Sequence, residues 1–344
     1  MKTFVTGATG LLGSNLVRAL RAEGHSARAL VRSKEKGQRQ LGDTGAELVV
    51  GDMENVPGFA GALDGVDVVF HTAAYFREYY GSGNHWPKLE AINVRGTVAL
   101  AEAARARGVK RLMDTSSSGT IGLKPDGSPG DEETAPASLA MGNLYFKSKV
   151  LAAAQLQQLA ARTGLDVVQI LPGWMFGPGD AAPTGSGQLV LDFLAGKLPA
   201  IPPGGTSAVD ARDVALGMIR AAERGRAGEK YILGGDFVTL ADVIRMLEKV
   251  TGRSGPRARI PYPVAFVYAA VSELWAKLTG GETLVTLPAV RLMQARLAVT
   301  SAKAEHELGW KHRPLRETLA DEVAWYRTQR LAAEPDARTT AVAA

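Results

Sequence analysis

The chain has 344 residues, no cysteine, 46% hydrophobic residues and a formal net charge of +5. This length suits one large domain, or one large and one small, and the hydrophobic share allows a sizeable core. The absence of cysteine excludes disulfides, and the five histidines show no metal-ligand spacing, so we expect no metal. The basic residues are dispersed, which fits a phosphate-bearing ligand and does not indicate a nucleic-acid groove.

The apolar segments of the sequence do not indicate a membrane protein. No signal-peptide pattern precedes the first apolar run, and we expect a cytoplasmic protein. The apolar stretch from Tyr262 to Thr279 is interrupted by Ser272, Glu273 and Lys277, so we expect no membrane span.

In the first half of the chain, short apolar runs alternate with amphipathic segments. The predicted strands are Lys2–Thr6, Ala27–Val31, Glu47–Val50, Asp67–Phe70, Arg111–Thr115 and Asp166–Leu171. Between them, helices are predicted over Leu11–Glu23, Lys88–Arg107 and Asn143–Arg162. This alternation predicts an α/β fold with a doubly wound parallel sheet of the Rossmann type, covered by helices on both faces.

The second half of the chain has a different character. The segment Ala181–Gly205 is rich in Gly, Pro, Ser and Thr and predicts a long excursion around one helix. Beyond it we predict a helix over Val209–Glu223 capped by Asp210, a strand over Lys230–Leu233, and helices over Leu240–Val250, Val264–Lys277 and Leu315–Gln329. We therefore expect a sheet domain over residues 1–180 with a return segment at 208–235, a smaller, mostly helical lobe from 181–207 and 236–330, and a flexible tail at 331–344.

A glycine-rich segment, TGATGLLG, follows the first strand and opens the first helix. Gly7 permits a tight turn, Gly10 lets the backbone approach a pyrophosphate, and Gly13 lets helix and strand pack closely. The helix N-terminus then favours the anion. The alternative is an ordinary strand–helix turn, but the strand before the glycines and the helix after them favour dinucleotide binding.

Two further motifs carry chemistry. Tyr145 and Lys149 are four residues apart, so on a helix they share a face, and the lysine ammonium favours the tyrosine phenolate. The serine cluster Asp114–Gly122 follows a predicted strand, at the carboxyl edge where α/β sheets bind ligands. A hydroxyl there can polarise a substrate carbonyl. A solvated helix face and a serine-rich turn are the ordinary alternatives.

In this order and spacing, the three motifs resemble those of the extended short-chain dehydrogenase/reductase family, over nearly the whole chain. The resemblance implies a catalytic Ser117, placed by the trailing Gly122, together with Tyr145 and Lys149. It also implies that Asn93 holds a water in a proton relay. The implied cofactor-binding residues are Gly7, Thr9, Gly10, Leu11, Leu12, Gly13, Arg32, Asp52, Met53, Thr72, Ala73, Ala74, Tyr145, Lys149, Pro172 and Gly173.

The end of the second strand favours NADP(H) over NAD(H). An NAD enzyme usually places a carboxylate there for the ribose 2′-hydroxyl, but the family's spacing puts Val31 at that position. Arg32 follows, and its guanidinium can bond a 2′-phosphate in fork geometry. A solvated basic turn is the alternative explanation.

The substrate is indicated less directly. Nucleotide-sugar enzymes of this family tend to carry an arginine where this chain has Thr206, whereas Tyr75, Phe76, Tyr79, Tyr80 and Trp86 could wall an apolar pocket or pack the loop. The closest resemblance is to the dihydroflavonol-4-reductase-like and 3β-hydroxysteroid-dehydrogenase-like branch. It implies an oxidoreductase that interconverts a ketone and a secondary alcohol on an apolar, aromatic or polycyclic molecule.

Two other functions stay open at this point, and so does the assembly. One is an NAD-dependent nucleotide-sugar 4-epimerase or dehydratase with the same three residues; the other is a non-catalytic dinucleotide-binding redox sensor. Family members commonly pair through the helices that carry the asparagine and the tyrosine, and both segments here are rich in alanine. We therefore expect a homodimer.

Overall fold

The computed structural model describes residues 1–76, 84–279 and 287–333. Its centre is a seven-stranded parallel sheet with the order β3-β2-β1-β4-β5-β6-β9. The strands are β1 (Lys2–Thr6), β2 (Ser26–Val31), β3 (Glu47–Val50), β4 (Val68–His71), β5 (Arg111–Thr115), β6 (Asp166–Pro172) and β9 (Lys230–Leu233). The order 3-2-1-4-5-6 is that of a dinucleotide-binding Rossmann sheet, so the predicted fold class is confirmed.

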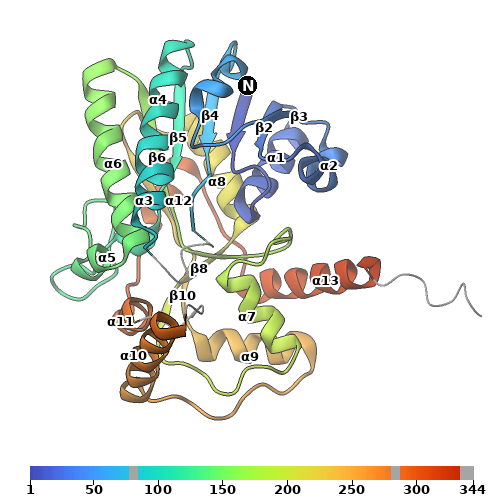
Figure 1. The fold of residues 1–344 in the computed structure, drawn as a ribbon, viewed down its shortest axis with the longest axis vertical. Helices are drawn as coiled ribbons and strands as arrows, with labels where there is room; N and C mark the ends of the chain where they lie inside the picture. The colour runs from blue at the N-terminus through green and yellow to red at the C-terminus, as the bar shows by residue number, and fades with distance from the viewer. Residues whose placement is uncertain (77–83, 280–286, 334–344) are drawn as a thin grey trace, which may run out of the picture.

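Successive residues of the central strands pack into two different cores, as the period of a strand requires. On one face, Val5, Phe70 and Met113 pack with α1 (Leu11–Ala22) and α8 (Ala211–Arg224). On the other face, the strands contribute Phe4, Val69 and Leu112 to the core beneath α4 (Thr97–Ala106) and α6 (Leu144–Thr163). Helices therefore cover both faces of the sheet, as Figure 1 shows.

The predicted helix over Lys88–Arg107 is three pieces in one helical run. These are α3 (Trp86–Leu89), a π-helical turn (Glu90–Gly96) and α4. Wider turns of this kind often occur at functional sites, and this one holds Asn93, which is 1% exposed. A Cβ on Gly96 would lie 2.9 Å from the Met53 carbonyl oxygen, so close packing explains this helical glycine.

Several short elements were not predicted. Ser33 caps α2 (Lys34–Leu41) by accepting a hydrogen bond from the Lys36 amide, where the sequence suggested only a basic turn. The other additions around the sheet are α5 (Ser138–Gly142) and α12 (Ala302–Leu308), with short 3₁₀ turns at Gly42–Thr44, Val56–Gly58, Ala60–Leu63 and Ser118–Thr120.

The second lobe combines helices with a small sheet that was not predicted. Its core joins α7 (Gly185–Leu194), α9 (Leu240–Thr251) and α13 (Leu315–Ala333). The sheet has the order β10-β8-β7 and consists of β7 (Trp174–Phe176), β8 (Gly205–Asp210) and β10 (Asp236–Thr239). Two more helices, α10 (Tyr262–Thr279) and α11 (Leu287–Ala295), pack on each other at the same end of the molecule (Figure 1).

The boundaries of α8 and α13 differ from the predictions. Val209 and Asp210 end β8 rather than begin a helix, because pairing with Met175 and Phe176 of β7 extends the chain there. Asp210 is nevertheless the predicted cap of α8 and accepts a hydrogen bond from the Arg212 amide at 2.7 Å. The last helix continues to Ala333, and the rest of the predicted flexible tail lies outside the described residues. Among those residues, no helix has the length and apolar character needed to cross a membrane.

A buried carboxyl in α13 gives the lobe a pH-dependent stability. Glu322 is fully buried, and its Oε2 accepts a hydrogen bond from the Gly177 amide. Burial raises the pKa of this carboxyl to about 8, and the charges of Asp180 and Asp210 act in the same direction. The pKa is higher in the folded than in the unfolded chain, where it is near 4.5. The contribution of this carboxyl to stability is therefore fully present below pH 4.5 and is lost as the pH rises through its folded pKa near 8.

We therefore expect the melting temperature to fall more between pH 6 and 9 in the wild type than in Glu322→Gln. The amide keeps an acceptor for Gly177 and cannot ionise. Glu317→Gln, an exposed change on the same helix, is the control and should follow the wild type. Melting curves across this range test the expectation, and parallel curves for all three proteins would contradict it.

Candidate active site

The first strand–helix connection forms a backbone cradle at the carboxyl edge of the sheet. Gly7 has φ +65°, and a Cβ there would lie 2.6 Å from the Ala73 amide nitrogen. A Cβ on Gly13 would lie 2.2 Å from the Gly7 carbonyl oxygen, so α1 can approach β1 only with glycine at this position. Gly10 begins α1 without any side-chain cap. The first amides of this helix can therefore bind the anionic pyrophosphate of a dinucleotide, and the residues present fit such a cofactor.

A cleft of about 500 Å³ opens along this edge. All of the implied cofactor-binding residues line it, although they come from the ends of five strands and from α1 and α6. Ser117 lines it too, beside Ser116 and Ser118. The structure thus brings the glycine segment, the serine cluster and the Tyr145–Lys149 pair together around one space, as the sequence predicted.

The helix α6 carries Tyr145 and Lys149 into the cleft. Asn143 fixes the start of this helix, because its Oδ1 accepts hydrogen bonds from the Tyr145 and Phe146 amides. The Lys149 Nζ donates to the Thr115 carbonyl oxygen at 2.7 Å and lies 5.9 Å from the centre of the Tyr145 ring. The predicted helical spacing therefore places both groups on the cleft side of α6.

Asn93 does not line the cleft but is hydrogen-bonded just behind it. Its Oδ1 accepts from the Tyr75 amide at 2.7 Å, and its Nδ2 donates to the Ser148 Oγ at 3.1 Å. The Ser148 hydroxyl in turn donates to the Tyr145 carbonyl oxygen at 2.6 Å. Asn93 thereby joins the loop after β4 to the first turn of α6, and its implied role in a proton relay stays a prediction.

Burial controls the charges beneath the cleft. It lowers the pKa of His71 to about 3, and the Lys149 charge adds to this, so the imidazole is neutral at physiological pH. This neutral ring is hydrogen-bonded to Thr6 and Thr97. Burial also lowers the pKa of Lys149 and raises that of Asp114, and the attraction between the two charges opposes both shifts. A carboxylate behind Lys149 was not recognised from the sequence.

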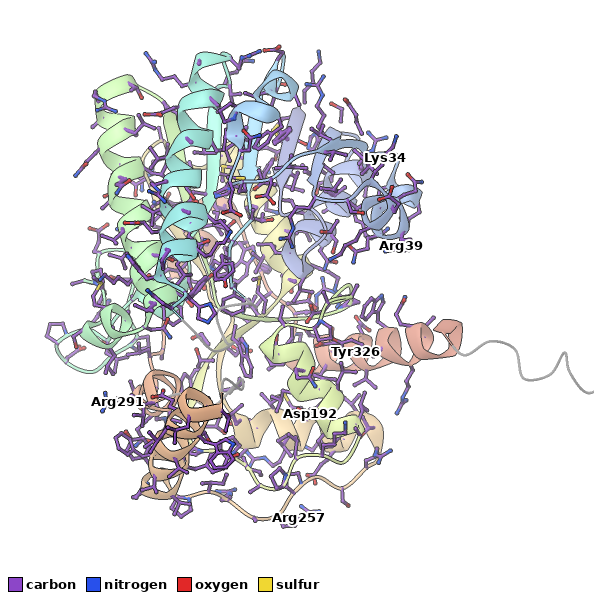
Figure 2. All side chains as sticks on the ribbon, viewed as in Figure 1. Lys34, Arg39, Asp192, Arg257, Arg291 and Tyr326 are labelled. Carbon is purple, nitrogen blue, oxygen red and sulfur yellow. The ribbon has the colours of Figure 1, made fainter. Side chains whose placement is uncertain are left out.

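At the end of β2, two basic residues line the cleft. Arg32 was predicted, and Lys36, in the first turn of α2, was not singled out for this role. Val31, the position of the acidic residue in NAD enzymes, is only 2% exposed and does not line the cleft, because its side chain packs against α2. Lys34 lies on the exposed outer surface of α2, where Figure 2 labels it.

The other half of the cleft is mainly aromatic and apolar. It is lined by Tyr75, Phe76, Phe146, Trp174, Met175 and Leu297. The centre of the Phe76 ring lies 4.7 Å from that of Tyr145. Thr206 also lines the cleft, and it is paired with Val238 of β10. The loop residues Tyr79 and Tyr80 lie outside the described residues, and Trp86 begins α3 without lining the cleft.

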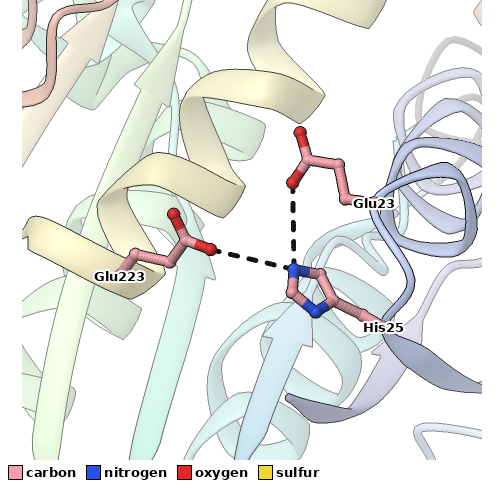
Figure 3. Close-up of side chains that lie close together, drawn as sticks. All are labelled: Glu23, His25 and Glu223. Carbon is pink, nitrogen blue, oxygen red and sulfur yellow. Dashed lines mark ion pairs between the residues drawn. The ribbon is translucent and has the colours of Figure 1, made fainter.

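One histidine, His25, lies close to two carboxylates, a grouping that was not predicted from the sequence. The His25 Nε2 lies 3.8 Å from a carboxylate oxygen of Glu23 and 3.8 Å from one of Glu223 (Figure 3). The Nδ1 atom lies 3.1 Å from the Met1 ammonium, which can only donate, so in the neutral ring Nε2 carries the proton.

The chain is similar to a family of known proteins over most of its length. The model of the NAD-dependent epimerase/dehydratase family matches residues 3–234. Sterol demethylase protein B of Methylococcus capsulatus is 33% identical over 329 residues, which are 95% of this chain and 98% of that protein. A ketoreductase of Stigmatella aurantiaca, named for a 3-oxo-4-farnesyl-dihydroquinoline-1-oxide substrate, is 32% identical over 91% of this chain and 92% of its own. The crystal structure of gox2253 superposes with a TM-score of 0.83 at 36% identity and covers 95% of this chain and 98% of that one.

The fold and the cleft thus define an enzyme of the extended short-chain dehydrogenase/reductase class, an oxidoreductase or epimerase that uses a nicotinamide dinucleotide. The chain belongs to the NAD-dependent epimerase/dehydratase family. Matches that are named for dihydroflavonol reductase and 3β-hydroxysteroid dehydrogenase confirm the branch that the sequence resembled.

Proposed function

We propose that the protein is an NADP(H)-dependent oxidoreductase that interconverts a ketone and a secondary alcohol on an apolar, aromatic or polycyclic small molecule. The observation that carries the proposal is the division of charge along the cleft. Among the described lining residues, the cations are Arg32, Lys36 and Lys149, and all three belong to the cofactor half. The substrate half offers aromatic rings and the carboxylate of Asp180, a set that suits a flat apolar molecule and opposes a diphosphate.

The names of the relatives support this class of substrate. One is named for sterols and another for reducing a ketone on an aromatic, farnesylated molecule. A non-catalytic sensor is less consistent with the arrangement, because such a protein needs neither the Tyr145–Lys149 pair nor the serine beside it.

The proposed mechanism divides the work among three side chains. When bound, the nicotinamide supplies or accepts the hydride. The Tyr145 hydroxyl would give a proton to the carbonyl oxygen in reduction, and the Tyr145 phenolate would take one from the alcohol in oxidation. Lys149 favours the phenolate by its charge and would bond the ribose, while the Ser117 hydroxyl would donate to the carbonyl oxygen and stabilise its developing charge. Arg32 and Lys36 would hold the 2′-phosphate.

Ligand binding separates this function from the nucleotide-sugar epimerase, which is the second candidate because its enzymes share the family and the three residues. We expect no thermal stabilisation by UDP or dTDP, because Thr206 cannot neutralise a diphosphate. An apolar aromatic or polycyclic ketone, given with NADP⁺, should raise the melting temperature, since a ligand at a hundred times its Kd stabilises the fold by about 2.7 kcal/mol. Differential scanning fluorimetry tests both expectations, and a clear shift with UDP alone would favour the epimerase.

The assembly and the location stay predictions. We propose that α4 and α6, which lie side by side on one face of the sheet, form a two-fold contact with the same helices of a second copy. The cytoplasm remains the expected location.

A further inference from the structure

The helix α10 carries an apolar stripe that the protein itself does not cover. Of the eleven large hydrophobic side chains that are exposed in the described residues, seven lie on this helix. They are 56–75% exposed and follow helical spacing on one face: Val264, Val267, Tyr268, Val271, Leu274, Trp275 and Leu278. Fourteen residues separate the first from the last, so the stripe is about 21 Å long. Contiguous apolar surface of this size marks an interaction site.

The other side of α10 is anchored to the protein, so the stripe is held outward. Ala265, Ala269 and Ala276 are buried beneath the helix. The Glu273 Oε1 accepts a hydrogen bond from the Leu287 amide at 2.7 Å, and the Arg291 guanidinium lies 5.3 Å from the centre of the Phe266 ring. Exposure of the stripe is therefore a consequence of the way α10 and α11 pack.

The segment of the chain that contains the stripe is positively charged. Residues 251–300 contain six Lys or Arg and two Asp or Glu, so this segment carries +4 of the chain's net +5. Arg253, Arg257 and Arg259 are exposed in the connection that leads into α10. Figure 2 shows Arg257 and Arg291 at the end of the molecule to which α10 belongs. The basic residues are dispersed along the sequence, but most of their excess over acidic residues comes from this segment.

We propose that the α10 stripe is a docking surface for an anionic lipid bilayer, on which the helix lies without crossing it. An interfacial helix needs an apolar face and a basic surround, and exposed Trp and Tyr side chains favour the headgroup boundary. Trp275 and Tyr268 provide these aromatic groups. A second copy of the chain fits less well, because a two-fold contact would set two segments of net charge +4 against each other.

Vesicle flotation of the full-length protein tests the proposal. We expect the wild type to float with vesicles of mixed phosphatidylcholine and phosphatidylglycerol, to float much less with phosphatidylcholine alone, and to be released by high salt. Val271→Glu should weaken partitioning into the vesicles by about tenfold or more. It removes one apolar side chain that the bilayer would bury, and it adds a negative charge. Arg257→Glu should weaken binding to the anionic vesicles only.

Val50→Glu is the matched control, because Val50 on β3 is 56% exposed and Val271 is 59% exposed, far apart in the fold. It should bind vesicles as the wild type does, and both valine variants should keep the wild-type melting temperature. A wild type that stays in the unbound fraction with both vesicle types would overturn the proposal. So would a dimer in sedimentation velocity that Val271→Glu alone converts to a monomer, since the stripe would then be a subunit interface.

Discussion

Replacing Tyr145 by phenylalanine is expected to reduce turnover by about 10²–10⁴-fold and to leave cofactor affinity and the melting temperature unchanged. The variant loses one hydroxyl and keeps the ring, which contacts Phe76 and Phe146. His71 cannot replace it as a proton donor, because burial holds its pKa near 3. Steady-state rates on a reducible substrate, together with cofactor titration, measure the two effects separately.

Two further variants sharpen this result. Lys149→Met should lose turnover and also weaken cofactor binding, because the ammonium acts on both Tyr145 and the ribose. Tyr268→Phe removes a hydroxyl from an exposed ring on α10 and should leave turnover unchanged. If Tyr145→Phe kept nearly wild-type turnover, the acid–base assignment would be wrong.

Arg32→Ala is expected to abolish most of a cofactor preference that we place at tenfold or more for NADPH over NADH. A charge-assisted bond from Arg32 to the 2′-phosphate contributes about 1.5–3 kcal/mol, or one to two decades of affinity. NADH has no such phosphate, so its binding should change little. Isothermal titration of both cofactors into the wild type and the variant measures the difference.

Two lysines of α2 provide a further variant and a control for the cofactor preference. Lys36→Ala should remove part of the preference as well, because Lys36 lines the same part of the cleft. Lys34→Ala, on the exposed side of α2, is the matched control and should have no effect. Val31→Asp would restore the acidic residue of NAD enzymes, but it is a poor way to favour NADH, because it would bury a carboxylate against α2. Equal affinity of the wild type for both cofactors would contradict the assignment of Arg32.

The sequence predicted the parts of the molecule that local patterns determine. Strands β1 to β6 and β9 are short runs rich in apolar residues, and the cradle at Gly7 and Gly13 needs only a strand before it and a helix after it. Tyr145 and Lys149 could be joined to the serine cluster because parallel strands end at one edge of the sheet. The implied cofactor residues therefore all line one cleft, and their roles stay predictions.

What the sequence did not predict depends on contacts between distant segments. The strand β8 pairs with β10, about 30 residues further along, and β7 has only three residues, so neither run shows a distinct period. The π-helical turn around Asn93 has the same apolar pattern as an ordinary helix. Glu223 approaches His25 only because α1 and α8 pack together on one face of the sheet.

The central claim is that this enzyme transfers hydride to an apolar ketone with NADPH. Its most direct test follows NADPH absorbance with the purified protein against aromatic ketones, 3-ketosteroids and UDP-sugars. We expect oxidation of NADPH with at least one apolar ketone, much slower oxidation of NADH, and loss of the reaction in Tyr145→Phe. Interconversion of a UDP-sugar with NAD, and no NADPH oxidation with any ketone, would contradict it.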